Sequence, residues 1–282
     1  MRFISVTKPG IIFGNLIAVL GGYFLASPHP ADFLYLLFTL LGISLVIASG
    51  CVFNNVIDRD IDRLMERTKN RVLAKDELSP AVALIYATLL GFAGFFVLNF
   101  YTNLLTVVVT AIGFVGYAGI YSLFIKRRSI LSTPIGAIAG AVPPVAGYCA
   151  VTNNFDTGTI LAFLILFFWQ MPHFYAIAIY RIQDFKAAKL PVLPITKSIY
   201  YTQIMMLIYI LVFTLVTLLP TFLGTMNYFY FCVALFLGLI WFILGLSTLK
   251  SQDNKIWARK MFLFSIINLT LLCMTIAGVS LY

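Results

Sequence analysis

Nine long apolar runs dominate this sequence and leave few folds open to it. Each run is long enough to cross a bilayer as a helix, for which about 20 residues are needed. Hydrophobic residues make up 61% of the 282 residues and charged residues 10%, and the mean hydropathy is +0.99. Such a composition excludes an ordinary soluble domain. We therefore predict an all-α membrane protein, a single bundle of nine transmembrane helices forming one domain over residues 1–282. The predicted spans lie near residues 9–26, 33–57, 80–100, 104–123, 133–151, 157–180, 202–222, 227–249 and 258–281.

The basic residues alternate with these runs. All 19 Lys and Arg residues precede the first span or follow the second, fourth, sixth or eighth, and the intervening connections carry none. The positive-inside rule then predicts a multi-pass protein of the cell (inner) membrane, with a cytoplasmic N-terminus and an outer C-terminus. The net charge of +9 marks one membrane side and predicts no nucleic-acid partner. The four Cys residues are isolated in apolar runs, which favours a packing role over a disulfide framework.

The second span ends in acidic residues that hydrocarbon would not tolerate without a use for them. Asn54, Asp58 and Asp62 recur every fourth residue, so a continuing helix would carry all three on one face. Mg²⁺ prefers a few carboxylate oxygens completed by water and phosphate oxygens, and the pattern indicates a pair of divalent cations with a phosphorylated ligand. The basic residues that follow offer donors to phosphate oxygens: Arg59, Arg63, Arg67, Lys69 and Arg71. The alternative, a solvated face that only maintains topology, would not require three Asp in five residues.

A second mixed cluster follows the sixth span on the same predicted side. Asp184 could reach a second cation, while Arg181 and Lys186 could neutralise charge on a departing diphosphate. Taken alone, these residues are better explained as a helix-end charge group. Their importance lies in sharing a membrane side with Asp58.

Two further residues have both a functional and a structural interpretation. Lys8, at the entrance to the first span, is either a topology anchor or a phosphate contact. His173 lies about 16 Å along a helix axis from Asp184, at about 1.5 Å per residue. At that depth it is either functional or a satisfied core histidine.

The fifth predicted span combines small residues with prolines. Gly136, Gly140 and Gly147 permit close helix contact. Pro143 and Pro144 predict a kink, because each removes a backbone donor and clashes with the preceding turn. The kink either opens space inside the bundle or only shapes the packing.

The motifs resemble the intramembrane aromatic prenyltransferases of the UbiA type, whose first motif is Asn-x-x-x-Asp-x-x-x-Asp. Within that family they resemble the branch that acts on heme. The resemblance covers about the first 200 residues and rests on Lys8 to Gly10, Asp58 to Asp62 with Arg67 and Arg71, Gly136 to Pro144, Trp169 to His173, and Tyr180 to Asp184 with Pro191 to Pro194. Two departures, Asn55 and Ala188, stand where other members have acids. With fewer carboxylates, a second cation would be held less securely. The two departures also favour the heme branch.

The resemblance implies Mg²⁺-dependent transfer of a farnesyl group from farnesyl diphosphate to a heme B vinyl group, with water addition giving heme O. The implied cavity is on the cytoplasmic side and holds two Mg²⁺ ions. The implied catalytic residues are Asp58, Asp62, Asp184 and Arg181, and the implied metal ligands are Asn54, Asp58, Asp62 and Asp184. The implied diphosphate contacts are Lys8, Asn54, Arg59, Arg67, Arg71 and Lys186, and the implied heme contact is His173. Aromatic faces of Phe53, Tyr117, Tyr121 or Tyr148 would enclose the allylic cation. Expected partners are membrane lipid and either heme A synthase or terminal oxidase assembly factors.

Three other functions compete with this one. A prenyltransferase for a quinone precursor or chlorophyllide would keep the diphosphate site and change the acceptor pocket. An ion-coupled secondary transporter would use Asp58 or Asp184, but transport sites lie near the midplane on broken helices, whereas these acids cluster at one membrane face. A non-catalytic assembly factor is the third.

Overall fold

The computed structural model describes residues 2–26, 32–247 and 253–281. Nine helical segments within these residues are long and apolar enough to cross a membrane, which confirms the predicted helical membrane fold. The observed spans differ from the predicted ones by a few residues: the seventh begins at Ile199 and the eighth ends at Leu246. Lys250, one of the basic residues that marked the predicted cytoplasmic side, lies outside the described residues. The helices are α1 (Arg2–Val6), α2 (Pro9–Ala26), α3 (Phe33–Ile57), α4 (Arg59–Asp62), α5 (Pro80–Tyr101), α6 (Leu104–Phe114), η1 (Val115–Ile125), α7 (Ser132–Gly140), α8 (Val142–Thr152), α9 (Thr157–Tyr180), α10 (Ile182–Ala187), α11 (Leu193–Thr196), α12 (Ile199–Phe222), α13 (Tyr228–Leu246) and α14 (Asn254–Ser280).

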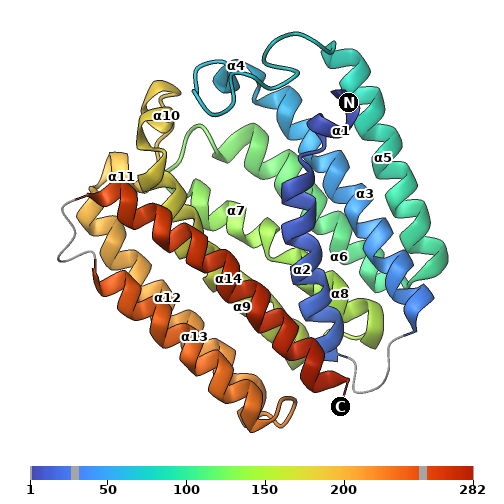
Figure 1. Ribbon diagram of the computed structural model, residues 1–282. Helices are drawn as coiled ribbons and strands as arrows, with labels where there is room; N and C mark the ends of the chain where they lie inside the picture. Colours follow the sequence, from blue (N-terminus) through green and yellow to red (C-terminus); the bar gives the residue numbers. More distant parts are fainter. Residues whose placement is uncertain (1, 27–31, 248–252, 282) are drawn as a thin grey trace.

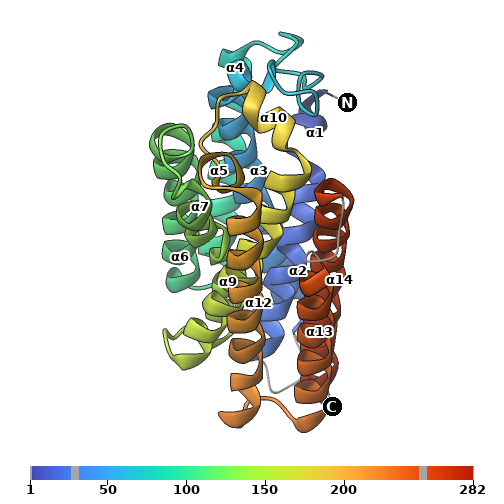
Figure 2. The same cartoon turned by 90° about the vertical axis from the view of Figure 1, so that its left-hand side faces the viewer.

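The long helices lie side by side and form one bundle (Figure 1). The short helices α4 and α10 lie at the same end of the bundle in both views, and the chain ends at the opposite end (Figures 1 and 2). The most extensive contacts join α3 to α5, α2 to α8, α9 to both α12 and α14, and α12 to α13. The two clusters that were far apart in the sequence therefore belong to one end of the molecule.

Polar caps define where several long helices begin. Asp32, Ser79, Asn103 and Ser198 each accept a backbone N–H from the first turn of the helix that follows. Asp156 forms a full capping box with Thr159. Since the first N–H groups of a helix lack intrahelical partners, these short polar side chains satisfy donors that lipid could not.

The predicted kink in the fifth span is a complete break. Helix α7 ends at Gly140 and α8 begins at Val142, directly before Pro143 and Pro144. Glycines let α2 lie against α8 at this level, because a Cβ on Gly22 would collide with the carbonyl oxygen of Pro144. The break therefore lies beside a close approach of α2 and α8.

The fourth predicted span changes its winding halfway. Its first half, α6, is a regular α-helix, and its second half, η1, is a π-helix of 11 residues. Ser122 Oγ donates to Tyr117 O, five residues earlier, at 2.8 Å, and Lys126 N donates to Tyr121 O at 3.0 Å. π-Helical turns are rare and occur often at functional sites. This segment ends beside the acidic residues that follow α3.

Candidate active site

Asp58 stands at the junction of two helices. Helix α3 ends at Ile57 and α4 begins at Arg59, yet the helical hydrogen bonds continue across the turn: Asp58 N donates to Asn54 O at 2.9 Å, and Asp62 N donates to Asp58 O at 2.8 Å. The backbone thus nearly maintains the predicted four-residue repeat. Because the helix changes direction at Asp58, the side chains of Asn54 and Asp58 share one environment and that of Asp62 lies in another.

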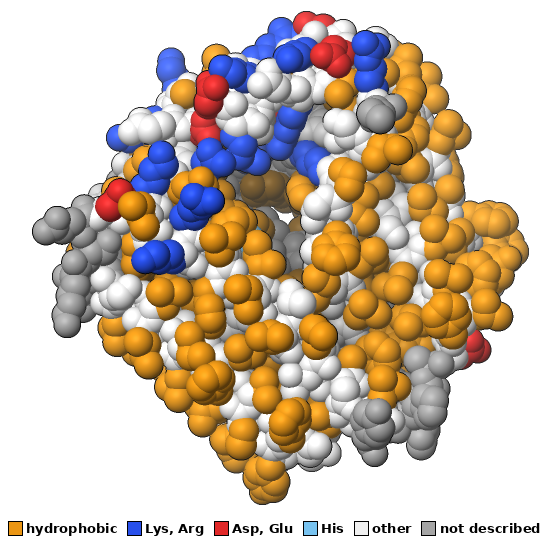
Figure 3. All heavy atoms as spheres, in the orientation of Figure 1, with side chains coloured by type: hydrophobic (Ala, Val, Ile, Leu, Met, Phe, Trp, Pro, Cys, Tyr) orange, Lys and Arg blue, Asp and Glu red, His pale blue; other side chains and the backbone are white. Residues whose placement is uncertain are grey.

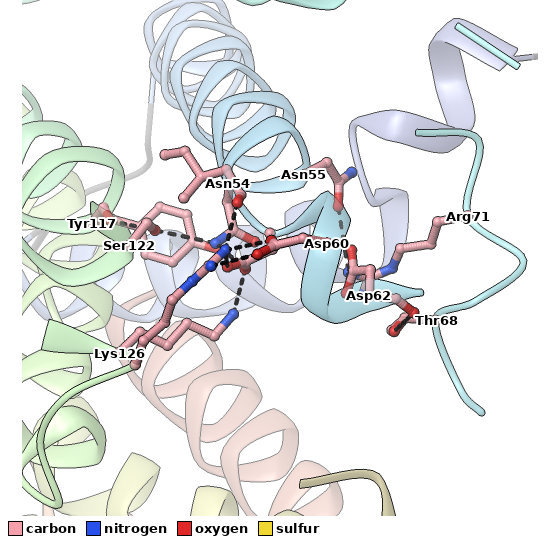
Figure 4. Close-up of polar contacts among 12 residues, drawn as sticks. Asn54, Asn55, Asp60, Asp62, Thr68, Arg71, Tyr117, Ser122 and Lys126 are labelled. Carbon is pink, nitrogen blue, oxygen red and sulfur yellow. Dashed lines mark hydrogen bonds and ion pairs between the residues drawn. The ribbon is translucent and has the colours of Figure 1, made fainter. Parts of the chain in front are cut away.

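The carboxylate of Asp58 is the buried centre of the first group, and only 1% of its side chain is exposed. Asn54 Nδ2 donates to Asp58 Oδ2 at 2.8 Å and to Ser122 Oγ at 3.1 Å. Lys126, which follows η1, forms an ion pair with the same Oδ2 atom (Figure 4). Positive charge therefore reaches Asp58 from a segment 68 residues away in the sequence.

Asp60 belongs to the same acidic run but is 61% exposed and has a different partner. Arg127 donates to both of its carboxylate oxygens, each at 2.7 Å. This hydrogen bonding lowers the pKa of Asp60 and raises that of Arg127.

The carboxylate of Asp62 is buried and pairs with Arg71. Arg71 Nη1 lies 2.9 Å and 2.7 Å from the two carboxylate oxygens and 3.4 Å from Asn55 Oδ1. Asn55 Nδ2 donates to Val6 O at 2.7 Å, a bond that an Asp in this position could not make. Asn55 therefore ties the start of the chain to the acidic motif, which gives a structural reason for the departure noted in the sequence.

Asp184 reaches the first cluster through the backbone. Its Oδ1 accepts a hydrogen bond from Glu66 N at 2.8 Å, between residues 118 positions apart. Apolar side chains join the same two loops in a small core: Ile61, Met65, Phe185, Ala188 and Leu190. The structure thus brings together the two clusters, as their shared membrane side predicted.

Arg67 lies in the loop after α4 and is exposed. Desolvation and the neighbouring Arg71 and Arg181 lower the pKa of its guanidinium, and the carboxylates of Asp62 and Asp184 act in the opposite direction. Its charge therefore lies near both acidic groups, on the exposed side of the cluster.

Lys8 joins the site from the start of α2. Its Nζ donates to Asn54 Oδ1 at 2.6 Å. Its backbone has φ +55°, a left-handed conformation that is uncommon outside glycine and is often found at functional sites. Burial lowers the pKa of Lys8 to about 8. This half-buried contact with Asn54 is one that a topology anchor would not require.

Three predicted residues lie further out. Arg59 and Lys186 are exposed on α4 and α10, so neither enters the buried cluster. Arg181 is half-buried between α9 and α10 and stacks on the Tyr180 ring, 4.5 Å from its centroid.

His173 forms a separate group on α9 and α14. Its Nδ1 lies 2.6 Å from Ser265 Oγ, and its ring stacks on Trp169 at 4.6 Å between centroids. Phe262 approaches the ring at 5.1 Å. The ring is half-buried, so it combines a satisfied hydrogen bond with a partly open face.

The aromatic residues predicted to enclose a cation do not all lie near the acids. Tyr117 and Tyr121 stack on η1 with 6.0 Å between their ring centroids. Tyr117 lies beside the Asn54–Ser122 bond, and its carbonyl accepts from Ser122 Oγ (Figure 4). Phe53 packs edge-on against Phe114. Tyr148 contacts Gly158, at the start of α9 and hence at the end of the bundle opposite Asp184, so the expectation for Tyr148 is wrong.

A hollow opens on the face shown in Figure 3, and Lys and Arg side chains gather along its edge. Hydrophobic side chains line the surface below that edge. The arrangement suits an amphipathic ligand with an anionic head.

The oxygen atoms of Asn54, Asp58 and Asp62 suit a Mg²⁺ ion that is also coordinated by a phosphorylated ligand. No three acidic, His or Cys side chains in the described parts of the chain are close enough to form a cation site alone. Instead, basic side chains contact Asp58 and Asp62 and neutralise the negative charge of these two carboxylates. However, Asp58 Oδ1 is buried without a hydrogen-bond partner. The atoms available to coordinate a metal ion here are all oxygens. Mg²⁺ is commonly bound by one or two carboxylates together with substrate phosphates, so these residues fit it.

Sequence reasoning missed three contributors: Ser122, Lys126 and Arg127. The run Lys126 to Arg128 served only as a marker of membrane side. Its signal was a dense basic group directly after a span. That signal alone does not specify which acid the group meets.

Comparison with known proteins identifies the family. Residues 15–267 match the UbiA prenyltransferase family, and the chain belongs to that family of prenyl-transferring membrane enzymes. Its similar relatives include the protoheme IX farnesyltransferase of Cronobacter sakazakii, 53% identical over 269 residues, which cover 95% of this chain and 91% of that protein. The protein of the same name from Photorhabdus laumondii is 52% identical over 95% of this chain and 92% of its own length. The resemblance inferred from the motifs is confirmed.

Solved structures agree on the fold. A digeranylgeranylglyceryl phosphate synthase superposes with a TM-score of 0.79 at 17% identity, covering 99% of this chain and 97% of the other. A UbiA homologue from Archaeoglobus fulgidus bound to GPP and Mg²⁺ superposes with a TM-score of 0.71 at 14% identity, covering 99% and 100%.

Proposed function

We propose that this protein transfers a farnesyl group from farnesyl diphosphate to a vinyl group of heme B, giving heme O. The observation that carries this proposal is the 53% identity, over 95% of the chain, to relatives named protoheme IX farnesyltransferase. A quinone-directed enzyme would be expected to share the family but not that degree of identity with heme-directed members.

The proposed diphosphate end is the cluster around Asp58 and Asp62. Lys8, Lys126 and Arg71 each contact an oxygen of Asn54, Asp58 or Asp62 and are long enough to turn towards phosphate oxygens instead. Arg67 would join them from the loop, with Arg59 and Lys186 as outer contacts. Guanidinium and ammonium groups are the usual donors to phosphate in proteins.

The proposed metal ligands are Asn54, Asp58, Asp62 and Asp184, for two Mg²⁺ ions. Mg²⁺ bound with the diphosphate supplies positive charge against the charge that develops on the leaving group. The buried carboxylates hold their positions through Asn54 and the Glu66 backbone, so little reorganisation is needed when the ligand enters. A solved structure of a UbiA homologue from A. fulgidus contains GPP together with Mg²⁺, which supports this proposal.

The proposed bond-breaking step relies on fixed charge and on exclusion of water. Arg181 and Lys126 would neutralise the departing diphosphate, while Tyr117 and Tyr121 present ring faces to the allylic cation next to the polar cluster. The quadrupole of a ring face attracts a cation electrostatically. This attraction would lower the energy of the allylic cation until the acceptor vinyl group reacts.

The proposed acceptor contact is His173. Its ring is partly open and is held by Ser265 and Trp169, which orient it for an iron or a propionate of the porphyrin. Trp169 and Phe262 add flat apolar surfaces on which a macrocycle could stack.

We further propose that residues 1–282 act as one domain in the inner cell membrane, with the acidic end of the bundle in the cytoplasm. The distribution of Lys and Arg supports this orientation. Heme A synthase or terminal oxidase assembly factors are the partners we expect to receive the product.

The decisive experiment compares acceptors. Membranes containing the protein are supplied with Mg²⁺ and farnesyl diphosphate, together with either heme B or a quinone precursor. The products are identified by their mass in mass spectrometry. We expect a farnesylated, hydrated product only with heme B. Prenylation of the quinone precursor alone would overturn the proposal.

A further inference from the structure

Arg127 makes several contacts at the junction between α3 and α4. Its Nη1 donates to Asp60 Oδ2 at 2.7 Å, and its Nη2 donates to Asp60 Oδ1 at 2.7 Å and to Ile57 O at 2.6 Å. The same Nη2 lies 3.8 Å from Asp58 Oδ1, beyond hydrogen-bond distance. One guanidinium therefore contacts residues on both sides of Asp58.

Each of these contacts fixes part of the junction. Ile57 O is the last carbonyl of α3, at the end where helical carbonyls run out of intrahelical donors, and Arg127 supplies a donor to it. Asp60 lies in α4, and its two-oxygen contact with a planar guanidinium defines orientation as well as distance. This one side chain therefore bridges α3 and α4, and it adds to the backbone hydrogen bonds that cross the junction.

We propose that Arg127 and Asp60 act as a positioning pair, which sets the α3–α4 junction so that Asp58 keeps one carboxylate oxygen directed to the metal and diphosphate. Neither residue touches the substrate. The inference rests on the proposed diphosphate site and adds two residues that the prenyltransferase motif does not explain.

The neighbouring residue shows why such a pair is useful. Lys126 contacts Asp58 Oδ2, and Asp58 Oδ1 has no hydrogen-bond partner. When a phosphate draws Lys126 away, the backbone at 126–127 stays attached to α3 and α4 through Arg127. Lys126 then moves by side-chain rotation alone, and Asp58 remains where it was. Both terminal nitrogens of Arg127 already donate to Asp60 or Ile57 O. Asp58 Oδ1 therefore remains available to a metal ion.

The test measures binding of Mn²⁺, a spectroscopic substitute for Mg²⁺, to the purified full-length protein with the non-cleavable analogue farnesyl thiodiphosphate. Free Mn²⁺ is followed by electron paramagnetic resonance. We expect Arg127→Gln and Asp60→Asn each to weaken Mn²⁺ binding by about tenfold or more, the loss typical for an outer partner of a metal ligand. The double variant should be no weaker than either single variant, because both changes remove the same pair.

The matched control is Asp76→Asn. Arg63 contacts both Asp76 oxygens at 2.5 Å and 2.6 Å, and this pair is also exposed and also close to a backbone carbonyl, Ala74 O. It does not touch the α3–α4 junction, so we expect its loss to change Mn²⁺ binding by less than about twofold.

A conservative variant separates positioning from charge. Arg127→Lys keeps the positive charge that supports membrane topology but cannot contact both Asp60 oxygens and Ile57 O together. We expect it to accumulate like the wild type and still bind Mn²⁺ more weakly. Wild-type binding in Arg127→Lys and Arg127→Gln would overturn the inference, as would additive losses in the double variant. Failure of the wild type to bind Mn²⁺ with the analogue would instead overturn the proposed function, and this inference with it.

Discussion

The two ends of the candidate site are built in different ways. Around Asp58, charged side chains from separate segments meet in ion pairs, and the carboxylates of Asp58 and Asp62 are almost completely buried. Around His173, neutral rings and one hydroxyl on α9 and α14 pack against each other. The first end is held by contacts that a charged ligand can replace, whereas the second is preformed by rigid helices. Loss of a charge at the first end leaves its partner buried and uncompensated, while loss of a ring at the second leaves a cavity.

The largest expected effect comes from removing a carboxylate at the charged end. We expect Asp58→Asn or Asp62→Asn to reduce heme O formation by about 10²-fold or more, because a fixed charge at the reacting group is lost. The assay uses membranes supplied with Mg²⁺, farnesyl diphosphate and heme B, with protein level checked by immunoblot. Full activity in both variants would remove the metal-binding assignment and with it the contrast between the two ends.

A smaller effect is expected from the basic partner. Lys126→Met keeps the apolar stem and removes the charge that contacts Asp58. We expect the KM for farnesyl diphosphate to rise by about tenfold, since a charged hydrogen bond contributes about 1.5–3 kcal/mol. Initial rates at varied farnesyl diphosphate and fixed heme B measure this.

Arg128→Met is the matched control for Lys126. Arg128 is exposed and lies two residues after Lys126. Its replacement by Met removes the same positive charge. A similar rise in KM for both variants would show that general positive charge, and not the contact with Asp58, controls diphosphate binding.

The smallest of the three effects is expected at the ring end, and it should be selective. We expect His173→Ala to raise the KM for heme B several-fold while leaving analogue binding unchanged, because loss of one ring contact costs about 1 kcal/mol. Titration of heme B by absorbance, alongside titration of farnesyl thiodiphosphate, separates the two. Equal losses for both ligands would contradict a heme role for His173 and a division of the site into two ends.

Much of the fold could be predicted because its signals are local. The length of each apolar run and the prolines at residues 143 and 144 gave the spans and the break between α7 and α8. The acidic motif could be read from its spacing, since helical neighbours four residues apart share a face. The π-helical winding of η1 could not be read in this way, because its residues have no composition that separates it from an α-helix.

The sequence by itself determined that this chain crosses the membrane many times and that its acids gather beyond the second and sixth spans. Hydropathy and charge depend only on the residues present, so they survive without knowledge of the packing. Only the tertiary structure decided which base meets which acid: Lys126 contacts Asp58, Arg127 contacts Asp60, and the Glu66 backbone contacts Asp184. These partners lie 67 to 118 residues apart, and any of several Lys and Arg residues on the same side would have satisfied the sequence equally. The choice follows from how the helices pack, which brings one end of η1 against the end of α3.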